Sequence, residues 1–203
     1  SGRRCGQQSA LFRSVSYIAM NQNKKLQMNP LSKSKLMAFR QCPRRLWLEV
    51  HQPHLREDSA QAKASFVVGN SVGEIARTLY DPKGKGQTVD LLAEGRQAAF
   101  ARTQSLLQTS APIFEAGFSA EGAMAFADVL LPARKAQAKV WRMVEVKSST
   151  SVKPSYRDDV AIQAFVANQA GVALASVALA HIDSQWVYQG DGNYDGLLHT
   201  EDL

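Results

Sequence analysis

The stretch KVWRMVEVKSST, residues 139–150, changes its character in the middle. It begins with the composition of a β-strand, places an acid and a base two residues apart, and then becomes a Ser/Thr loop. Side chains two residues apart in a strand point to the same face. We therefore expect one face made of Trp141, Met143, Glu145 and Lys147, and a second made of Arg142, Val144 and Val146. A half-exposed strand whose last charges meet water has the same pattern, so the rest of the chain must decide between a structural and a catalytic end.

The composition predicts one folded domain with a proper core. The chain has 203 residues, of which 45% are hydrophobic. No apolar run approaches the roughly 20 residues that a membrane span needs. The only cysteines, Cys5 and Cys42, are far apart in the sequence. Two such residues do not make a disulfide framework, and a reducing cytoplasm is the simplest expectation.

The charge is distributed unevenly along the chain. The net charge is +6, yet residues 1–50 contain ten Lys or Arg and a single acid, Glu49. The first part therefore carries +9, and the remainder carries −3. This asymmetry favours an anionic partner, with nucleic acid as the leading candidate. A solvated basic tail would have the same charge.

The N-terminal region divides into an extension and a helical segment. Residues 1–28 are polar, basic and only weakly periodic, which predicts a poorly ordered extension and leaves 29–203 as the domain. Met28 would be a natural start. From Pro30 the pattern predicts two short helices that break near Pro43, with Ser32 or Ser34 as the first cap.

The remaining elements predict an α/β fold, in which helices flank a mixed central sheet behind the N-terminal helical segment. The last residues show no closing element, so the chain could be the front domain of a longer protein. The expected elements are helices over 57–80 and 90–109, two strands around Glu121-Gly122, the strand of 139–147, a helix ended by Gly171, a strand over 172–182 and a short last strand over 186–190.

Two carboxylates are expected to meet on the sheet. Asp128 ends the apolar run of the second strand, and a hairpin can bring it beside Glu145 if the register allows. Two carboxylates repel each other unless a proton or a divalent cation lies between them. Oxygen ligands without His or Cys favour Mg²⁺ or Mn²⁺. Lys147 would then hold a water against a phosphate and offset developing charge.

The helix after this strand adds a polar stripe to an apolar surface. Asp159 and Gln163 are four residues apart on a helix that is apolar nearly all round and is expected to be buried. Buried polar groups need partners, which a metal site or a substrate phosphate would supply. The structural alternative is that Asp159 caps the helix and Gln163 bonds a loop carbonyl.

Together these residues resemble the PD-(D/E)XK nuclease superfamily, and the RecB-like branch with the CRISPR-adaptation exonucleases is the most similar. The resemblance rests on Asp128, the run Glu145-Val146-Lys147 and Gln163, and on the opening LSKSKLMAFRQCPRRLWL. It covers about residues 31–203 and looks like the nuclease-like N-terminal domain of a longer bacterial protein. It implies a restriction-endonuclease-like core and a Mg²⁺- or Mn²⁺-dependent deoxyribonuclease.

The resemblance also assigns roles to residues. Asp128, Glu145 and the carbonyl of Val146 would bind the metal, Lys147 would activate or position the attacking water, and Gln163 would lie at the edge of the site. Glu74 and Glu115 are looser matches for further metal ligands, and surface or salt-bridge roles explain them as well.

The chain departs from the branch at two places. Ala167 stands where the helix usually carries a Tyr four residues after the Gln. Many relatives hold an iron–sulfur cluster whose first Cys matches Cys42, but no C-terminal Cys trio follows here. We therefore expect no cluster, and we expect Cys42 to be a buried structural residue.

Three functional hypotheses remain. The first is a nuclease that cuts DNA, gripped through phosphate contacts by Arg40, Arg44, Arg45 and Lys153. The second is a catalytically silent nuclease-fold module that binds nucleic acid or a partner protein. The third is an enzyme for a small phosphorylated substrate, which no Gly-rich phosphate loop supports. His51, His54 and His181 have no motif spacing and are expected to be structural or exposed.

Overall fold

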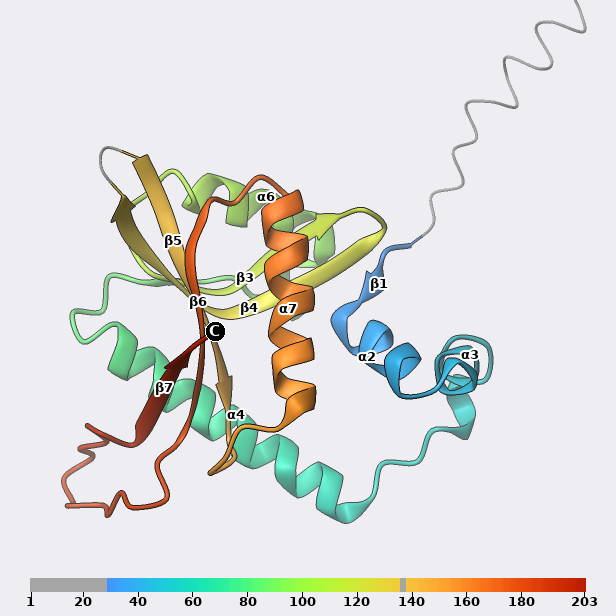
Figure 1. Cartoon of the computed structure of the whole chain (residues 1–203), viewed down its shortest axis with the longest axis horizontal. Helices are drawn as coiled ribbons and strands as arrows, with labels where there is room; N and C mark the ends of the chain where they lie inside the picture. Colours follow the sequence, from blue (N-terminus) through green and yellow to red (C-terminus); the bar gives the residue numbers. More distant parts are fainter. Residues whose placement is uncertain (1–28, 136–137) are drawn as a thin grey trace, which may run out of the picture.

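The computed structural model describes residues 29–135 and 138–203, so the predicted extension over 1–28 lies outside the described residues. The described chain forms an α/β fold around a mixed sheet of seven strands (Figure 1). The strand order is β2-β3-β4-β5-β6-β7, and β1 pairs with the beginning of β4. The predicted class, a mixed central sheet flanked by helices, is confirmed.

The elements have the following bounds. The strands are β1 (Leu31–Ser32), β2 (Gln87–Thr88), β3 (Ile113–Ala120), β4 (Ala123–Lys135), β5 (Ala138–Lys147), β6 (Leu174–Ile182) and β7 (Leu198–Asp202). The helices are α2 (Lys33–Gln41), α3 (Pro43–His51), the 3₁₀ turn η1 (Pro53–Leu55), α4 (Ala60–Tyr80), α5 (Leu91–Glu94), α6 (Arg96–Leu106) and α7 (Pro154–Gln169). None of the helices in the described ranges is long and apolar enough to cross a membrane.

The sheet separates two apolar cores. β3, β4 and β5 are antiparallel neighbours, β5 and β6 run parallel, and β7 closes the edge antiparallel to β6. Trp141 and Met143 belong to the larger core, which includes residues of α6 and α7. Val144 belongs to the smaller core, against which Tyr80 of α4 packs. The predicted alternation along β5 is therefore confirmed.

The helices are less completely buried than their sequences suggest. On α7, Val166 and Ala167 are buried, but Phe165 is 53% exposed, so the expectation of a helix buried nearly all round is wrong. On α4, Val72 is buried whereas Val68 is 50% exposed, because the first half of the helix extends past the sheet (Figure 1). The helix expected over 90–109 breaks at Gly95, whose φ of 77° does not fit a helix.

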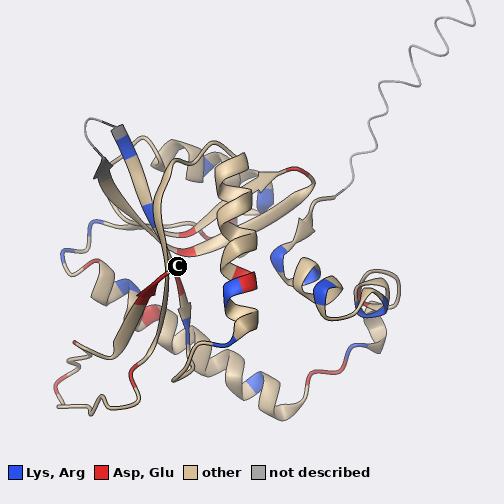
Figure 2. Ribbon diagram, viewed as in Figure 1, with Lys and Arg blue, Asp and Glu red and all other residues tan. Residues whose placement is uncertain are grey.

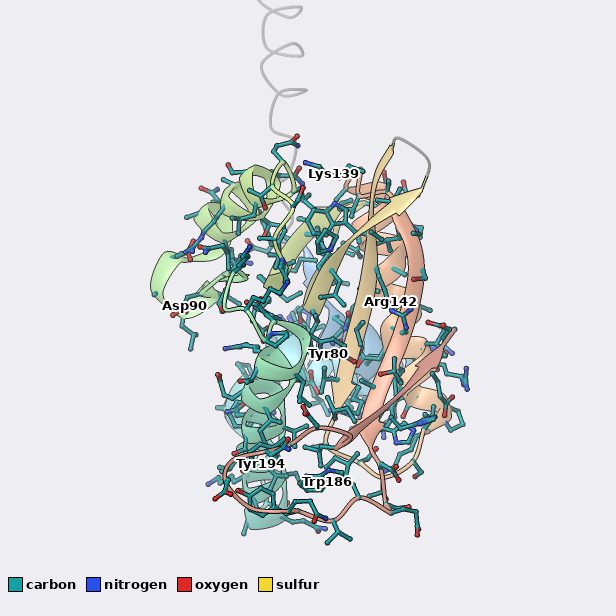
Figure 3. All side chains as sticks on the ribbon, turned by 90° about the vertical axis from the view of Figure 1, so that its left-hand side faces the viewer. Tyr80, Asp90, Lys139, Arg142, Trp186 and Tyr194 are labelled. Atoms are coloured by element: carbon teal, nitrogen blue, oxygen red, sulfur yellow. The ribbon has the colours of Figure 1, made fainter. Side chains whose placement is uncertain are left out.

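The C-terminal part corrects two expectations. Residues 186–190 form no strand. The rings of Trp186 and Tyr188 stack on the ring of Tyr194 in the loop before β7, and Figure 3 shows Trp186 and Tyr194 side by side there. The closing element is β7 instead, which the sequence reading missed. Tyr80 at the end of α4 helps to hold β7, since its hydroxyl lies 3.1 Å from Oγ1 of Thr200.

Candidate active site

The β4–β5 hairpin brings the two predicted carboxylates together. Val129 pairs with Val144, and one step further along the same register lie Asp128 and Glu145. The backbone N–H of Val146 donates to Oδ2 of Asp128 at 2.7 Å. The aspartate side chain thus reaches across to β5 and fixes the position of the Glu145–Lys147 segment.

Glu145 is the centre of a buried polar network. Its side chain is 2% exposed, and its Oε1 accepts from Nζ of Lys147 at 2.5 Å and from Nζ of Lys33 at 3.0 Å. Its Oε2 accepts from Nε2 of Gln163 at 2.5 Å. Oε1 of the fully buried Gln163 has no hydrogen-bond partner among the described residues. This orphan acceptor leaves room for one further donor, such as a water.

Asp159 completes the network from α7. Its Oδ2 accepts from Lys147 at 2.6 Å, and its Oδ1 lies 3.2 Å from Nζ of Lys33. The ring of Tyr156, one turn earlier on α7, lies 5.4 Å from Nζ of Lys147. Asp159 does not cap the helix, since the N-cap position belongs to Lys153. Asp159 and Gln163 therefore face one site, as their four-residue spacing predicts.

The two lysines dominate the electrostatics of Glu145. Burial alone would raise the pKa of Glu145, but Lys33, Lys147 and the hydrogen bonds from Lys147 and Gln163 outweigh it and lower the pKa to about 2. Burial would lower the pKa of Lys147 in turn, yet Glu145 and Asp159 raise it above its ordinary value. Lys147 is therefore an ammonium ion at neutral pH and has no lone pair with which to take a proton.

Asp128 has the opposite environment. Burial raises the pKa of its carboxyl well above the ordinary value, and the negative charges of Glu145 and Glu115 add to this effect. Lys33 and the hydrogen bond from Val146 only partly offset them. The negative charge of an ionised Asp128 is thus only partly neutralised by its neighbours, and a bound divalent cation would neutralise it further.

A cavity of about 420 Å³ opens beside these residues, between α4, the middle of β4 and the end of β5. Glu74 and Glu115 line it together with Asp128, but both are paired with Arg77, at 2.9 and 3.0 Å. Glu115 has a φ of 56°, a left-handed conformation that costs a non-glycine residue roughly 1–3 kcal/mol and is often found at functional sites. The two looser candidates therefore reach the cavity as partners of an arginine.

The predicted nucleic-acid contacts lie on α2, α3 and the start of α7. Arg40 pairs with Asp158 at 2.9 Å and Arg45 with Glu49 at 2.8 Å. Arg44 makes no ion pair within residues 29–135 and 138–203, and Lys153 is exposed at the N-cap of α7. The helices α2 and α3 form an arm beside α7, and Figure 2 shows their basic residues.

Cys42 corrects the expectation of a buried thiol. The residue is exposed, and it ends α2 and begins α3. Its N–H donates to the carbonyl of Ala38 and its carbonyl accepts from Arg45, both at 2.9 Å. The position therefore serves the bend between two helices through its backbone.

Lys33 is the site residue that the sequence reading missed. It lies 112 positions before Glu145, so only the tertiary fold brings the two together. One signal was present: Lys33 is the first residue of α2, where the helix dipole disfavours a cation. A lysine in that position indicates a partner elsewhere.

No family model matches the chain, and no curated protein is significantly similar to it in sequence. The arrangement offers two neighbouring carboxylates, a permanently charged lysine, a buried amide and an adjoining cavity. Such a site can hold a cation and stabilise negative charge on a bound anion.

Proposed function

We propose that this protein is a divalent-metal-dependent nuclease that hydrolyses phosphodiester bonds in DNA. The observation that carries the proposal is the meeting of Asp128, Glu145 and Lys147 at one cavity, where Gln163 holds Glu145 from the buried side. The helix–β-β-β-α-β order of the domain is consistent with a restriction-endonuclease-like core, which we propose as its fold family.

The donor set fits a hard cation. Asp128, Glu145 and the Val146 carbonyl would hold Mg²⁺ or Mn²⁺, both of which prefer oxygen ligands. Glu145 presents Oε1 to two ammonium groups, so a cation there would compete with Lys33 or Lys147 for that oxygen. The bound ion would supply Lewis-acid polarisation of the phosphodiester and a more acidic water.

Lys147 acts as a fixed positive charge in this mechanism. Because its pKa is raised, it donates hydrogen bonds to the attacking water or to a phosphate oxygen and does not remove a proton. Asp159 holds the ammonium from the other side at 2.6 Å, and Gln163 orients Glu145. These contacts position the reacting groups before substrate arrives.

A silent binding module is the second candidate. The observation that favours it is the closed network itself, since Glu145 is already satisfied by Lys33, Lys147 and Gln163. Such a network could serve only to tie α2 and α7 to the sheet. Cleavage separates the two candidates, because only the nuclease turns over DNA.

We also infer a reducing, cytoplasmic setting. The Cys42 thiol is free and exposed, and thiols of this kind persist where the compartment is reducing.

The test is cleavage of labelled DNA, linear and circular, single- and double-stranded, in Mg²⁺, Mn²⁺ or EDTA. We expect metal-dependent cutting that Glu145→Gln and Lys147→Met each reduce by at least about 100-fold. Glu57→Gln is the matched control, because Glu57 is exposed and lies outside the cavity lining.

Circular substrates then distinguish endonuclease from exonuclease activity, since only an endonuclease cuts them. If folded wild-type protein binds DNA and cuts none of the four substrates in either metal, the nuclease proposal is wrong and the binding module stands.

A further inference from the structure

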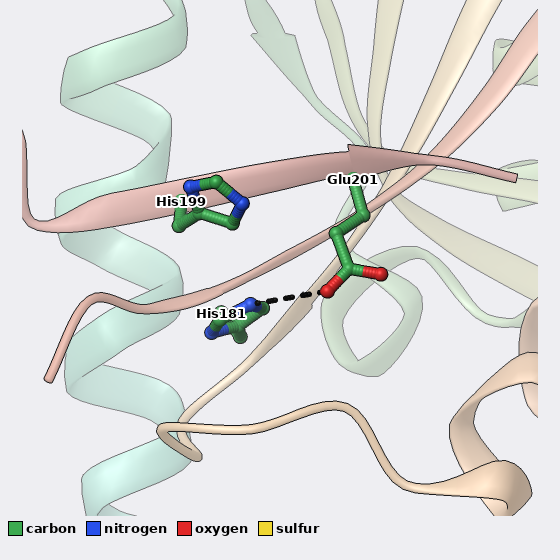
Figure 4. A group of neighbouring side chains, drawn as sticks. All are labelled: His181, His199 and Glu201. Carbon is green, nitrogen blue, oxygen red and sulfur yellow. Dashed lines mark ion pairs between the residues drawn. The ribbon is translucent and has the colours of Figure 1, made fainter.

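A second group of potential metal ligands lies on β6 and β7. His181 is the register partner of His199, and Glu201 lies two residues further along β7, opposite Leu179. Cross-strand partners and residues two apart share a face, so all three side chains lie on the same side of the sheet (Figure 4). One ligand atom from each lies within 4.8 Å of the others.

The hydrogen bonds around His181 prepare its outer nitrogen as a ligand. Nδ1 lies 3.1 Å from the carbonyl oxygen of Ile182, which can only accept, so Nδ1 carries the proton. The lone pair of the neutral ring is then on Nε2, which faces Oε1 of Glu201 at 3.6 Å. A backbone carbonyl that fixes the tautomer in this way is the usual outer contact of a metal-binding histidine.

Glu201 is also held in place. Its Oε2 accepts from Nη2 of Arg157 on α7 at 3.1 Å, which leaves Oε1 directed at His181. Two ligands at roughly 2.0–2.1 Å from a tetrahedral ion are roughly 3.4 Å apart. The 3.6 Å between His181 and Glu201 is close to that value, and a ring nitrogen of the exposed His199 lies within 4.8 Å of both ligand atoms.

We propose that His181, His199 and Glu201 bind a transition-metal ion of the Zn²⁺ class. Two imidazoles and one carboxylate with an open fourth position are ligands that suit zinc, whereas the all-oxygen set of Asp128 and Glu145 suits Mg²⁺ or Mn²⁺. The bound ion fastens the edge strand β7 to β6 and so fixes the loop between them. This site does not depend on the nuclease proposal.

The experiment uses the untagged full chain after EDTA treatment and dialysis. Zn²⁺ is titrated by calorimetry in a large excess of Mg²⁺, which keeps hard-cation sites filled, and Co²⁺ is followed by its visible absorption. We expect one Zn²⁺ per chain at micromolar affinity or tighter, and a Co²⁺ spectrum typical of mixed nitrogen and oxygen ligands. Zn²⁺ should also raise the melting temperature, because it binds the folded form.

The variants assign the site. His199→Ala and Glu201→Gln should each weaken Zn²⁺ binding by about 100-fold or more, since loss even of an outer contact costs roughly 10- to 100-fold. His54→Ala, in an exposed turn, should bind like the wild type. Circular dichroism shows whether each variant is folded. Because both positions are at least partly exposed and each variant tests the site separately, a folding failure in one variant leaves the other as a test. If the wild type binds no Zn²⁺, or if both variants bind it unchanged, the proposal is overturned.

Discussion

Glu145 links the candidate site to the acid stability of the fold. Its folded pKa of about 2 lies below the ordinary value of 4.5, so the ionised form stabilises the protein. This stabilisation is complete above about pH 4.5 and is lost as the pH falls through about 2. The shift corresponds to ~3 kcal/mol, of which ~2 kcal/mol should be lost between about pH 6 and pH 3, as urea unfolding of the wild type can measure.

Glu145→Gln supplies the comparison for this pH dependence. At about pH 6 the variant should be less stable by roughly 3–5 kcal/mol, because Lys33 and Lys147 lose their shared partner. The difference from the wild type should shrink toward pH 3. A difference that stays constant over that range would mean that Glu145 is not the group that titrates.

Asp128 should behave in the opposite way. Its raised pKa means that the ionised form costs stability at neutral pH, and the cost disappears when the group is protonated below its folded pKa. Asp128→Asn keeps an oxygen that accepts from Val146 and removes the repulsion from Glu145. We expect the variant to be more stable at pH 7 by about 0.5–2 kcal/mol and to have lost cleavage.

Thermal melts at about pH 7 and cleavage assays check this pair of outcomes. Glu121→Gln, in the exposed β3–β4 turn, should change neither quantity. A destabilised Asp128→Asn would show that the carboxylate is there for the fold and not for a ligand.

Much of the site at the level of single residues follows from local spacing. Glu145 and Lys147 share a face because of the strand period, and Asp159 and Gln163 because of the helix period. The Asp128–Glu145 contact needs one hairpin register, which the sequence allowed without fixing it. The partners of Arg77 and Lys33 could not be predicted, because Glu115 and Glu145 lie 38 and 112 positions away from them.

Among the elements, the strands with strong apolar alternation were predicted, whereas the edge strand β7 was not. Residues 198–202 read LHTED, a polar sequence that becomes a strand because β6 offers an open edge. Residues 186–190 have the composition of a strand, but Gly190 and Gly192 have positive φ and the aromatic rings stack within the loop. Pairing with β6 therefore overrides local propensity at β7, and the conformation of the loop overrides it over 186–190.

Alanine substitutions at two glycines, one in β3 and one in α4, test how closely these elements are packed. A Cβ on Gly117 would lie 2.6 Å from Cε1 of Phe126 and 3.0 Å from Cδ1 of Phe100, two rings that stack on each other. Gly117→Ala should therefore cost roughly 1–3 kcal/mol by overpacking. Gly73 in α4 has no atom within 4 Å of such a Cβ, so Gly73→Ala should stabilise the helix by about 0.5–1 kcal/mol.

Urea unfolding of these two variants beside the wild type checks the opposite signs. If Gly117→Ala is neutral, then the Phe100–Phe126 pair can move, and β3 is less tightly packed against α6 than its buried Ala99 and Thr103 indicate.

In the molecule as a whole, basic charge projects from the sheet on the arm formed by α2 and α3. No residue of α3 is buried, and Trp47 on it is 53% exposed. The ammonium of Lys33 at the base of α2 reaches Glu145, so the arm is tied to the candidate site. If the protein binds DNA as proposed, DNA on the arm would lie near the contact of Lys33 with Glu145.

Arg44 is the residue on which this arrangement can be tested. Arg40 and Arg45 already pair with acids, whereas Arg44 is available to a phosphate within the described part of the chain. In an Asp128→Asn background, where we expect no cutting, Arg44→Ala should weaken the binding of DNA to a similar extent whatever the DNA sequence. It should also reduce the slope of log K against log salt by about 1.

Arg102→Ala is the matched control, because Arg102 lies on α6 and pairs with Glu94 at 2.5 Å. Fluorescence anisotropy with a labelled oligonucleotide over a series of salt concentrations gives both slopes. The control should keep the parent slope. Equal slopes for the two variants would mean that Arg44 makes no phosphate contact and that the arm does not hold DNA through this residue.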